Sequence, residues 1–167
     1  MLRQAITAIS FSLCVIASPA QSVNVSPGAL VTFYSSGPTV YGKPGSLGAF
    51  MGNIYVDGHE FGRLERHRFV TFSLTPGSHV FALSWWTNKN PDRDARLTID
   101  LDADHAYFLS TNFMGTSWNG SSALVIRKVT CEAAIADNAD AKPLDPQHLK
   151  ADGVAALVRS AVFPKCQ

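Results

Sequence analysis

The sequence has little charge and no excess of either sign. Only 16% of its 167 residues are charged, and 14 Lys and Arg against 13 Asp and Glu give a formal net charge of +1. A surface that binds nucleic acid or an anionic membrane needs a basic excess to neutralise phosphates, and this chain has none. Because 46% of the residues are apolar and 10% aromatic, we expect one ordinary folded domain with its own core and not a disordered chain.

Sequence signatures of catalysis and metal binding are also missing. The chain has no GxGxxG or Walker A motif and no CxxC pair, and its 5 histidines form no HxH, HxxxH or HExxH pattern. The spacing of Asp100, Asp102 and Asp104 resembles a calcium loop, but His105 and Thr111 stand where that loop needs Gly and Glu. We therefore predict a protein that is not an enzyme and has no cofactor, no metal and no catalytic residues. A hydrolase with a scattered Ser, His and acid is the less favoured alternative.

No apolar run is long enough to span a bilayer, which takes about 20 residues. The N-terminal run Ala5–Ala17 has 13 residues, follows the single charge of Arg3 and precedes the small residues Ser18–Ala20. This order predicts a secretory signal peptide, residues 1–20, cleaved after Ala20. The mature chain is then periplasmic or extracellular and has no transmembrane helix. A buried N-terminal helix or a membrane anchor is the alternative.

Cysteine is scarce, and signal cleavage removes Cys14. The two that remain, Cys131 and Cys166, suggest one disulfide in an exported protein. It would close a loop of about 36 residues and stabilise the fold by about 4 kcal/mol in the chain-entropy model. Two unrelated thiols are the alternative.

Short β-branched and aromatic segments separated by turn signals fill most of the chain after the signal peptide. We predict strands over residues 29–34, 49–56, 59–64, 69–74, 79–86, 96–102, 105–111 and 122–130. Leu97, Ile99 and Leu101 alternate with polar residues, which is typical of a half-buried antiparallel strand. The fold class is therefore mainly β, an antiparallel sandwich of about seven to eight short strands.

The composition changes after residue 130. Residues 131–139 favour a helix, and apolar residues recur at near-helical spacing over 152–163. We expect a β-sandwich domain over residues 21–130. A helical tail over 131–167 follows, with a C-terminal helix packed on the sandwich and a disulfide tying its end.

Two turns are specified by their residue types. Asp57-Gly58 is a strong two-residue hairpin signal, and Pro76-Gly77 sets the next hairpin by fixing one φ angle and permitting a positive one. His79 follows this second turn, and its ring can bond the turn backbone. A structural histidine is favoured over a metal ligand because no partner lies at ligand spacing.

The order of these turn motifs resembles a known family. Residues 55–58 (YVDG), 61–64 (FGRL) and 74–81 (LTPGSHVF), followed by 97–101 and 107–109, resemble the bacterial domain of unknown function 2846 family and, more distantly, PEGA-type modules. The resemblance covers about residues 29–130 and implies a small antiparallel β-sandwich of the cell envelope, without catalytic residues. The chain departs from the pattern in its Trp85-Trp86 pair, its long tail and its lack of a lipoprotein cysteine.

The tryptophans are the remaining candidates for a binding site. Neighbouring strand residues face opposite ways, so we place Trp85 in the core with Phe81 and Leu83, and Trp86 on the other face. Trp118 lies in a loop over residues 113–121. If exposed, Trp86 and Trp118 suit sugar stacking or a protein interface; the alternative is that the tail or the loop buries them.

The expected function is that of a non-catalytic envelope protein. Its partner is either another protein or cell-wall glycan, and the glycan- or peptidoglycan-binding module is the alternative to the protein-interaction module. This choice rests on the resemblance of fold alone.

Overall fold

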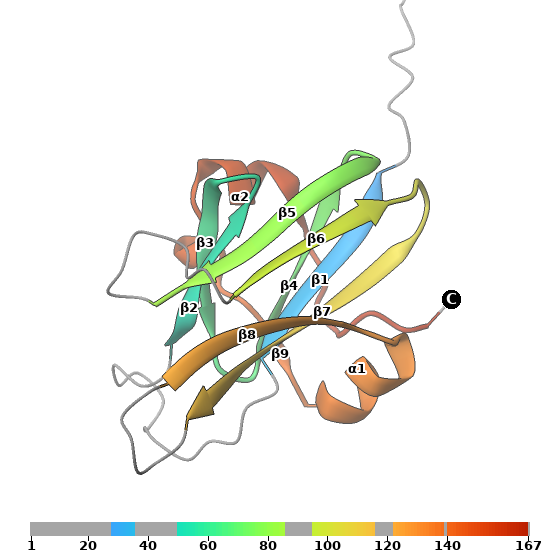
Figure 1. Cartoon of the computed structure of the whole chain (residues 1–167). Coiled ribbons are helices and arrows are strands. Elements are labelled where there is room, and N and C mark those ends of the chain that lie inside the picture. Colours follow the sequence, from blue (N-terminus) through green and yellow to red (C-terminus); the bar gives the residue numbers. More distant parts are fainter. Residues whose placement is uncertain (1–27, 36–49, 86–94, 116–121, 139, 167) are drawn as a thin grey trace, which may run out of the picture.

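The computed structural model describes residues 28–35, 50–85, 95–115, 122–138 and 140–166 (Figure 1). The predicted signal peptide lies outside these residues. In the described part, eight strands of six or more residues build two facing sheets: β1 (Ala29–Ser35), β2 (Phe50–Val56), β3 (His59–Glu65), β4 (Arg68–Leu74), β5 (Gly77–Ser84), β6 (Arg96–Leu101), β7 (Ala106–Gly115) and β8 (Ser122–Val129). The predicted β-sandwich class is confirmed.

The larger sheet has the order β10-β4-β1-β7-β8, and β9 also pairs with β4. The first strand, β1, lies in the middle of this sheet, antiparallel to β4 and parallel to β7. The parallel pair is a departure from the all-antiparallel sandwich that we expected. It is possible because the whole smaller sheet lies between β1 and β7 in sequence, which gives the long crossover that parallel neighbours need.

The smaller sheet has the order β3-β2-β5-β6. Its pairing of β2 with β3 shifts by one residue, because Ile54 lies opposite Gly62 and the next residue, Tyr55, lies opposite Glu60. The strand β6 alternates as predicted: Ile99 and Leu101 are buried and Leu97 is partly buried, whereas the polar residues Arg96, Thr98 and Asp100 are exposed. Next to this irregular pairing, Gly62 of β3 forms an isolated bridge with Leu149 of the tail.

The core between the sheets is centred on three phenylalanines. The Phe33 ring centroid lies 6.1 Å from that of Phe72 in the same sheet and 5.6 Å from that of Phe81 in the facing sheet, both edge to face. Such pairs contribute beyond their buried area by about 0.5–1.5 kcal/mol each. The Phe33–Phe81 pair packs one sheet against the other.

The tail after β8 is a mixture of short elements: α1 (Cys131–Asn138), β9 (Lys142–Pro143), the 3₁₀ turn η2 (Pro146–His148), α2 (Ala151–Ala156) and β10 (Leu157–Val158). The predicted C-terminal helix is therefore present but shorter than expected. Its last apolar residues, Leu157 and Val158, pair with Phe72 and Thr71 at the edge of β4. Pairing with a free strand edge overrides the helical spacing here.

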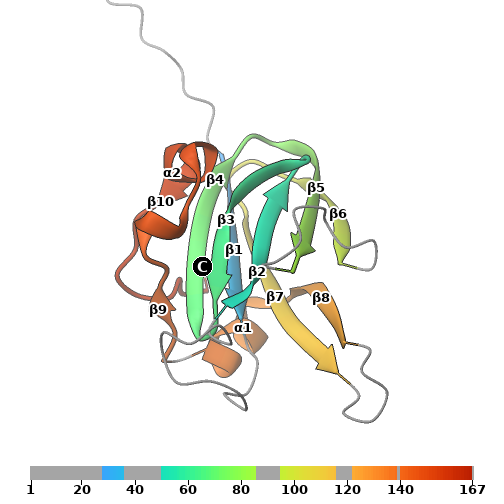
Figure 2. The same cartoon turned by 90° about the vertical axis from the view of Figure 1, so that its left-hand side faces the viewer.

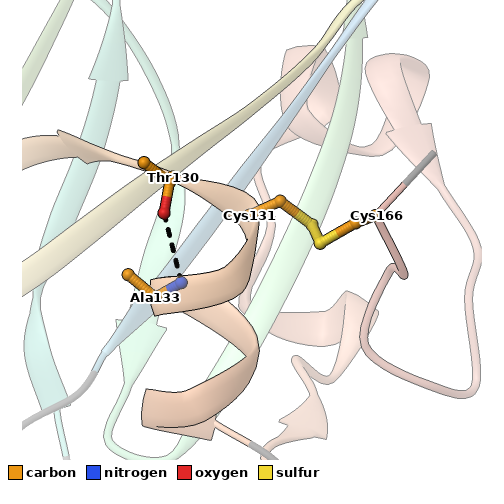
Figure 3. The surroundings of a disulfide bond; sticks show 4 residues. All are labelled: Thr130, Cys131, Ala133 and Cys166. Carbon is orange, nitrogen blue, oxygen red and sulfur yellow. Dashed lines mark hydrogen bonds between the residues drawn. A yellow bond between two sulfur atoms is a disulfide. The ribbon is translucent and has the colours of Figure 1, made fainter.

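The tail is fastened at both ends. Thr130 begins α1, where its hydroxyl accepts a hydrogen bond from Ala133 N at 3.3 Å. The disulfide between Cys131 and Cys166 then links the start of α1 to the end of the chain, with a Cα–Cα distance of 5.6 Å (Figure 3). The predicted disulfide is confirmed.

A second apolar cluster lies under the tail, on the outer face of the larger sheet. The Phe163 ring centroid lies 5.6 Å from that of Tyr34, 5.2 Å from that of Phe69 and 6.0 Å from that of Phe108. Ala134 of α1 belongs to the same cluster. Burial raises the pKa of Tyr34 above its ordinary value, and the nearby Asp137 carboxylate raises it further. The disulfide and Phe163 therefore fix the end of the chain together.

Candidate functional site

The residues singled out as turn formers meet in one polar cluster. Asp57 and Gly58 form the turn between β2 and β3 with φ of 52° and 83°, and Gly77 follows Pro76 at the start of β5 with φ of 130°. The positive angles at these positions are those that Asp tolerates and glycine adopts without strain. The two turns lie close enough for their side chains to bond, and His79 makes the connection.

The imidazole of His79 is engaged at both nitrogens. Nδ1 lies 2.7 Å from Asp57 Oδ2, and Nε2 lies 2.8 Å from the Thr75 carbonyl oxygen. The other carboxylate oxygen of Asp57 accepts a hydrogen bond from Val80 N at 2.8 Å. Both partners are acceptors, so a ring nitrogen that carries a proton can donate to the group that it faces. This His–Asp pair therefore connects the β2–β3 turn to the β4–β5 turn.

Electrostatics agree with this structural role. Burial raises the pKa of the Asp57 carboxyl, but the hydrogen bonds from Val80 N and the His79 ring outweigh it and hold the pKa below its ordinary value. The ionised carboxylate is therefore the form that the folded turn prefers.

A second polar group lies where η2 meets β3. Glu65 Oε1 lies 3.5 Å from His148 Nδ1, and Glu60 Oε1 lies 3.9 Å from Lys150 Nζ. Next to them is an open polar hollow of about 200 Å³. Its lining carries charges of both signs, of which Glu60 and Lys150 pair with one another, as on an ordinary solvated surface. Among the residues that the structure describes, no group of three or more His, Cys, Asp or Glu could hold a metal ion.

The structure describes one of the three tryptophans. Trp85 is partly buried and packs against the core, as its strand parity predicts. Trp86 and Trp118 lie outside the described residues. The glycan-stacking platform proposed for them stays a prediction.

The four lateral edges of the two sheets are covered unequally. The tail covers two of them: β9 and β10 pair with β4, while Lys150 N donates to the Phe61 carbonyl oxygen of β3 at 2.9 Å. Figure 2 shows these tail elements on the side of β4, with β6 and β8 on the other side. Within the described ranges, no strand pairs with the outer edge of β6 or β8. Unpaired edges are templates for the addition of another strand.

The hydrogen bonds between β1 and β7 show which backbone groups of β7 face β8. Leu30 N donates to the His105 carbonyl oxygen at 2.8 Å, so the odd-numbered residues of β7 direct their backbone groups to β1. Because successive residues of a strand point their amides to opposite sides, the even-numbered residues of β7 face β8.

The same odd–even alternation shows which amides of β8 are not bonded to β7. Asn112 of β7 lies opposite Val125, so the odd-numbered residues of β8 bond to β7. The amides and carbonyls of Leu124, Ile126 and Lys128 therefore point away from β7, toward the open edge. The side chains of Leu124 and Ile126 are buried in the core, which fixes this strand rigidly in place. The edge of β8 is the candidate functional site.

The side chains at the end of this edge are basic. Arg127 and Lys128 are exposed, and Lys128 Nζ lies 4.8 Å from the centroid of the Tyr107 ring. The sequence predicts the strand but not that it lies at an edge. Two consecutive cations in an otherwise apolar strand are the signal that could have indicated it, because edge strands carry such charges to discourage unwanted pairing.

No family model, no curated protein and no solved structure matches the chain. The resemblance to the domain of unknown function 2846 family and to PEGA-type modules therefore stays a prediction. In the described part of the chain, no helix has the length and apolar character needed to cross a membrane.

Proposed function

We propose that this chain is an exported, non-catalytic β-sandwich protein of the cell envelope that binds an extended segment of a protein partner along β8. The unequal cover of the sheet edges carries this proposal. The tail pairs with β4 and bridges to β3, whereas among the described residues no strand pairs with the outer edge of β8. The disulfide between Cys131 and Cys166 supports export, since disulfides persist in oxidising compartments. The engagement of both His79 nitrogens by turn acceptors supports a non-catalytic role.

The partner segment would add as a further strand beside β8. Its backbone would bond to the outward amides and carbonyls of Leu124, Ile126 and Lys128, and acidic side chains near one end would face Arg127 and Lys128. Main-chain hydrogen bonds provide the affinity in this mode, and the side chains provide the specificity.

The first test measures whether the edge is free. In amide hydrogen exchange of the isolated protein, we expect the outward amides of Leu124 and Ile126 to exchange faster than the inward amides of Val125 and Arg127. Equal protection of the two sets would contradict the free edge.

The second test removes one outward amide. Lys128→Pro deletes the amide of an exposed edge residue, which the sandwich tolerates because that N–H is not bonded to β7. Lys128→Gln keeps the amide and removes the charge. With a photo-crosslinking residue at position 125, we expect partner crosslinks in intact cells from the parent and from Lys128→Gln, and their loss in Lys128→Pro. Equal crosslinking in all three, or equal crosslinking from a probe at Arg63 on the covered strand β3, would overturn the proposal.

A further inference from the structure

An apolar cavity of about 230 Å³ lies at the covered edge of the larger sheet, between β9 and β10. Its walls come from β4 and from the tail, and include Phe69, Val70, Leu144, Leu157 and Val158. It is separate from β8, which lies at the other end of the same sheet.

The residues that line this cavity include one charged side chain, which is positive. Arg159 is the only charged residue among those that line the cavity. Within the described part of the chain, no carboxylate pairs with Arg159, although other surface cations such as Arg68 and Lys150 have acidic partners. An exposed guanidinium without a counter-ion beside an apolar hollow complements a ligand that has an apolar body and one anionic end.

The polar groups of the wall are already engaged. The Thr71 hydroxyl lies 2.9 Å from the hydroxyl of Thr32, and the Ser160 hydroxyl donates to the Val162 carbonyl oxygen. A ligand therefore gains little from further polar groups along its body. Two prolines, Pro143 and Pro146, also line the cavity and restrict the backbone of its rim.

We propose that this cavity binds a short aliphatic carboxylate, with the hydrocarbon chain inside and the carboxylate paired with Arg159. At about 30 Å³ for each water-sized group, the cavity has room for roughly eight such groups, which corresponds to a chain of about six to eight carbons. The planar guanidinium can bond a carboxylate through two parallel N–H groups.

The test compares two probes that differ only in their charged end. Octanoate and 1-octanol are titrated into the purified, oxidised full chain below micellar concentrations, with methyl NMR as the readout. We expect octanoate to shift the methyl signals of Val70, Leu144 and Leu157. Arg159→Gln should weaken octanoate binding about threefold to tenfold and leave 1-octanol binding unchanged. Lys165→Gln, which removes an exposed cation of the tail that does not line the cavity, should change neither.

A second variant fills the cavity itself. Val158→Trp places a larger side chain in the wall without altering the backbone pairing of β10 with β4. We expect this variant to lose the binding of both probes. Its melting temperature should stay within a few degrees of that of the parent. The proposal is overturned if the three methyl signals do not respond to octanoate, if Arg159→Gln binds octanoate as well as the parent does, or if Val158→Trp folds and still binds.

Discussion

The imidazole of His79 lies 2.7 Å from the carboxylate of Asp57, a residue that precedes it by 22 positions. The Asp57 carboxylate also accepts a hydrogen bond from Val80 N, in the hairpin that carries His79. The His79 ring also bonds the Thr75 carbonyl oxygen, in its own turn. The β2–β3 and β4–β5 turns therefore behave as one unit at this end of the sandwich.

This contact predicts a pH-dependent loss of stability in Asp57→Asn. Asn tolerates the positive φ of the turn but removes the charge, and at pH 7 we expect a loss of about 1 kcal/mol, because the carboxylate is partly exposed and screened. The folded pKa of Asp57 lies below the unfolded one, so its contribution is present above the unfolded pKa and is lost as pH falls through the folded value. The difference between parent and variant should therefore shrink below about pH 4.

Urea unfolding of both proteins at pH 7 and pH 3 measures this difference. Asp100→Asn, on the exposed face of β6, serves as a control that we expect to follow the parent at both pH values. A loss in Asp57→Asn that stays constant from pH 7 to pH 3 would contradict the assignment of the effect to the ionised carboxylate.

Removal of the disulfide should destabilise the whole domain and not only the tail. Cys131 and Cys166 are separated by 35 positions, and the chain-entropy model gives about 4 kcal/mol for a loop of this length. We expect the double variant Cys131→Ser/Cys166→Ser to unfold at lower urea concentration by a corresponding amount. The control is a reductant, which should destabilise the parent to the same extent and leave the double variant unchanged.

Phe163 should matter more than its place near the chain end suggests. Its ring meets three aromatic rings of the larger sheet, so Phe163→Ala should cost about 2 kcal/mol, less than for a fully buried phenylalanine. The neighbouring Val162 is 67% exposed, and Val162→Ala should change stability by less than about 0.5 kcal/mol. Thermal melts of the two variants make the comparison, and similar melting temperatures would argue against the packing of Phe163 on the sheet.

Substitution of Gly153 in α2 should destabilise the protein, because there is no space for a side chain at this position. A Cβ at Gly153 would collide with the Phe61 carbonyl of β3, whereas a Cβ at Gly58 would have nothing within 4 Å. We expect Gly153→Ala to cost about 2–3 kcal/mol through overpacking. Gly58→Ala, at a φ of 83°, should cost about 1 kcal/mol through backbone strain alone. The reverse order in urea unfolding would mean that α2 does not pack closely on β3.

Local patterns predicted the strands well, because each strand carries its own turn signal or alternation. Leu97, Ile99 and Leu101 face the core side as their alternation indicates, and Asp57-Gly58 forms the turn that its residue types favour. At Gly62 the backbone of the tail approaches β3 closely, since a Cβ there would lie 2.8 Å from the His148 carbonyl oxygen.

Features that depend on distant partners could not be predicted in this way. The spacing of Leu157 and Val158 fits a helix as well as a strand, and only the free edge of β4 decides between them. The parallel pairing of β1 with β7 leaves no local signal, because the register is set by packing of strands that are far apart in sequence. Likewise, the turn motifs predicted both Asp57 and His79 as structural residues but not their contact.

The position of β1 has a consequence for the order of events during synthesis. Among the described strands, β1 is made first, yet it lies in the middle of its sheet and has both neighbours only when β7 has been made. The outer edge of β4 is paired only when β10 has been made. Such long-range pairing slows folding, because distant segments must meet before they gain contacts. Loss of the last 11 residues, 157–167, removes β10, Phe163 and Cys166 together. The sandwich is therefore complete only after residues 157–166 have been made, and a chain that stops before residue 157 should have an uncovered edge at β4 and be prone to aggregate.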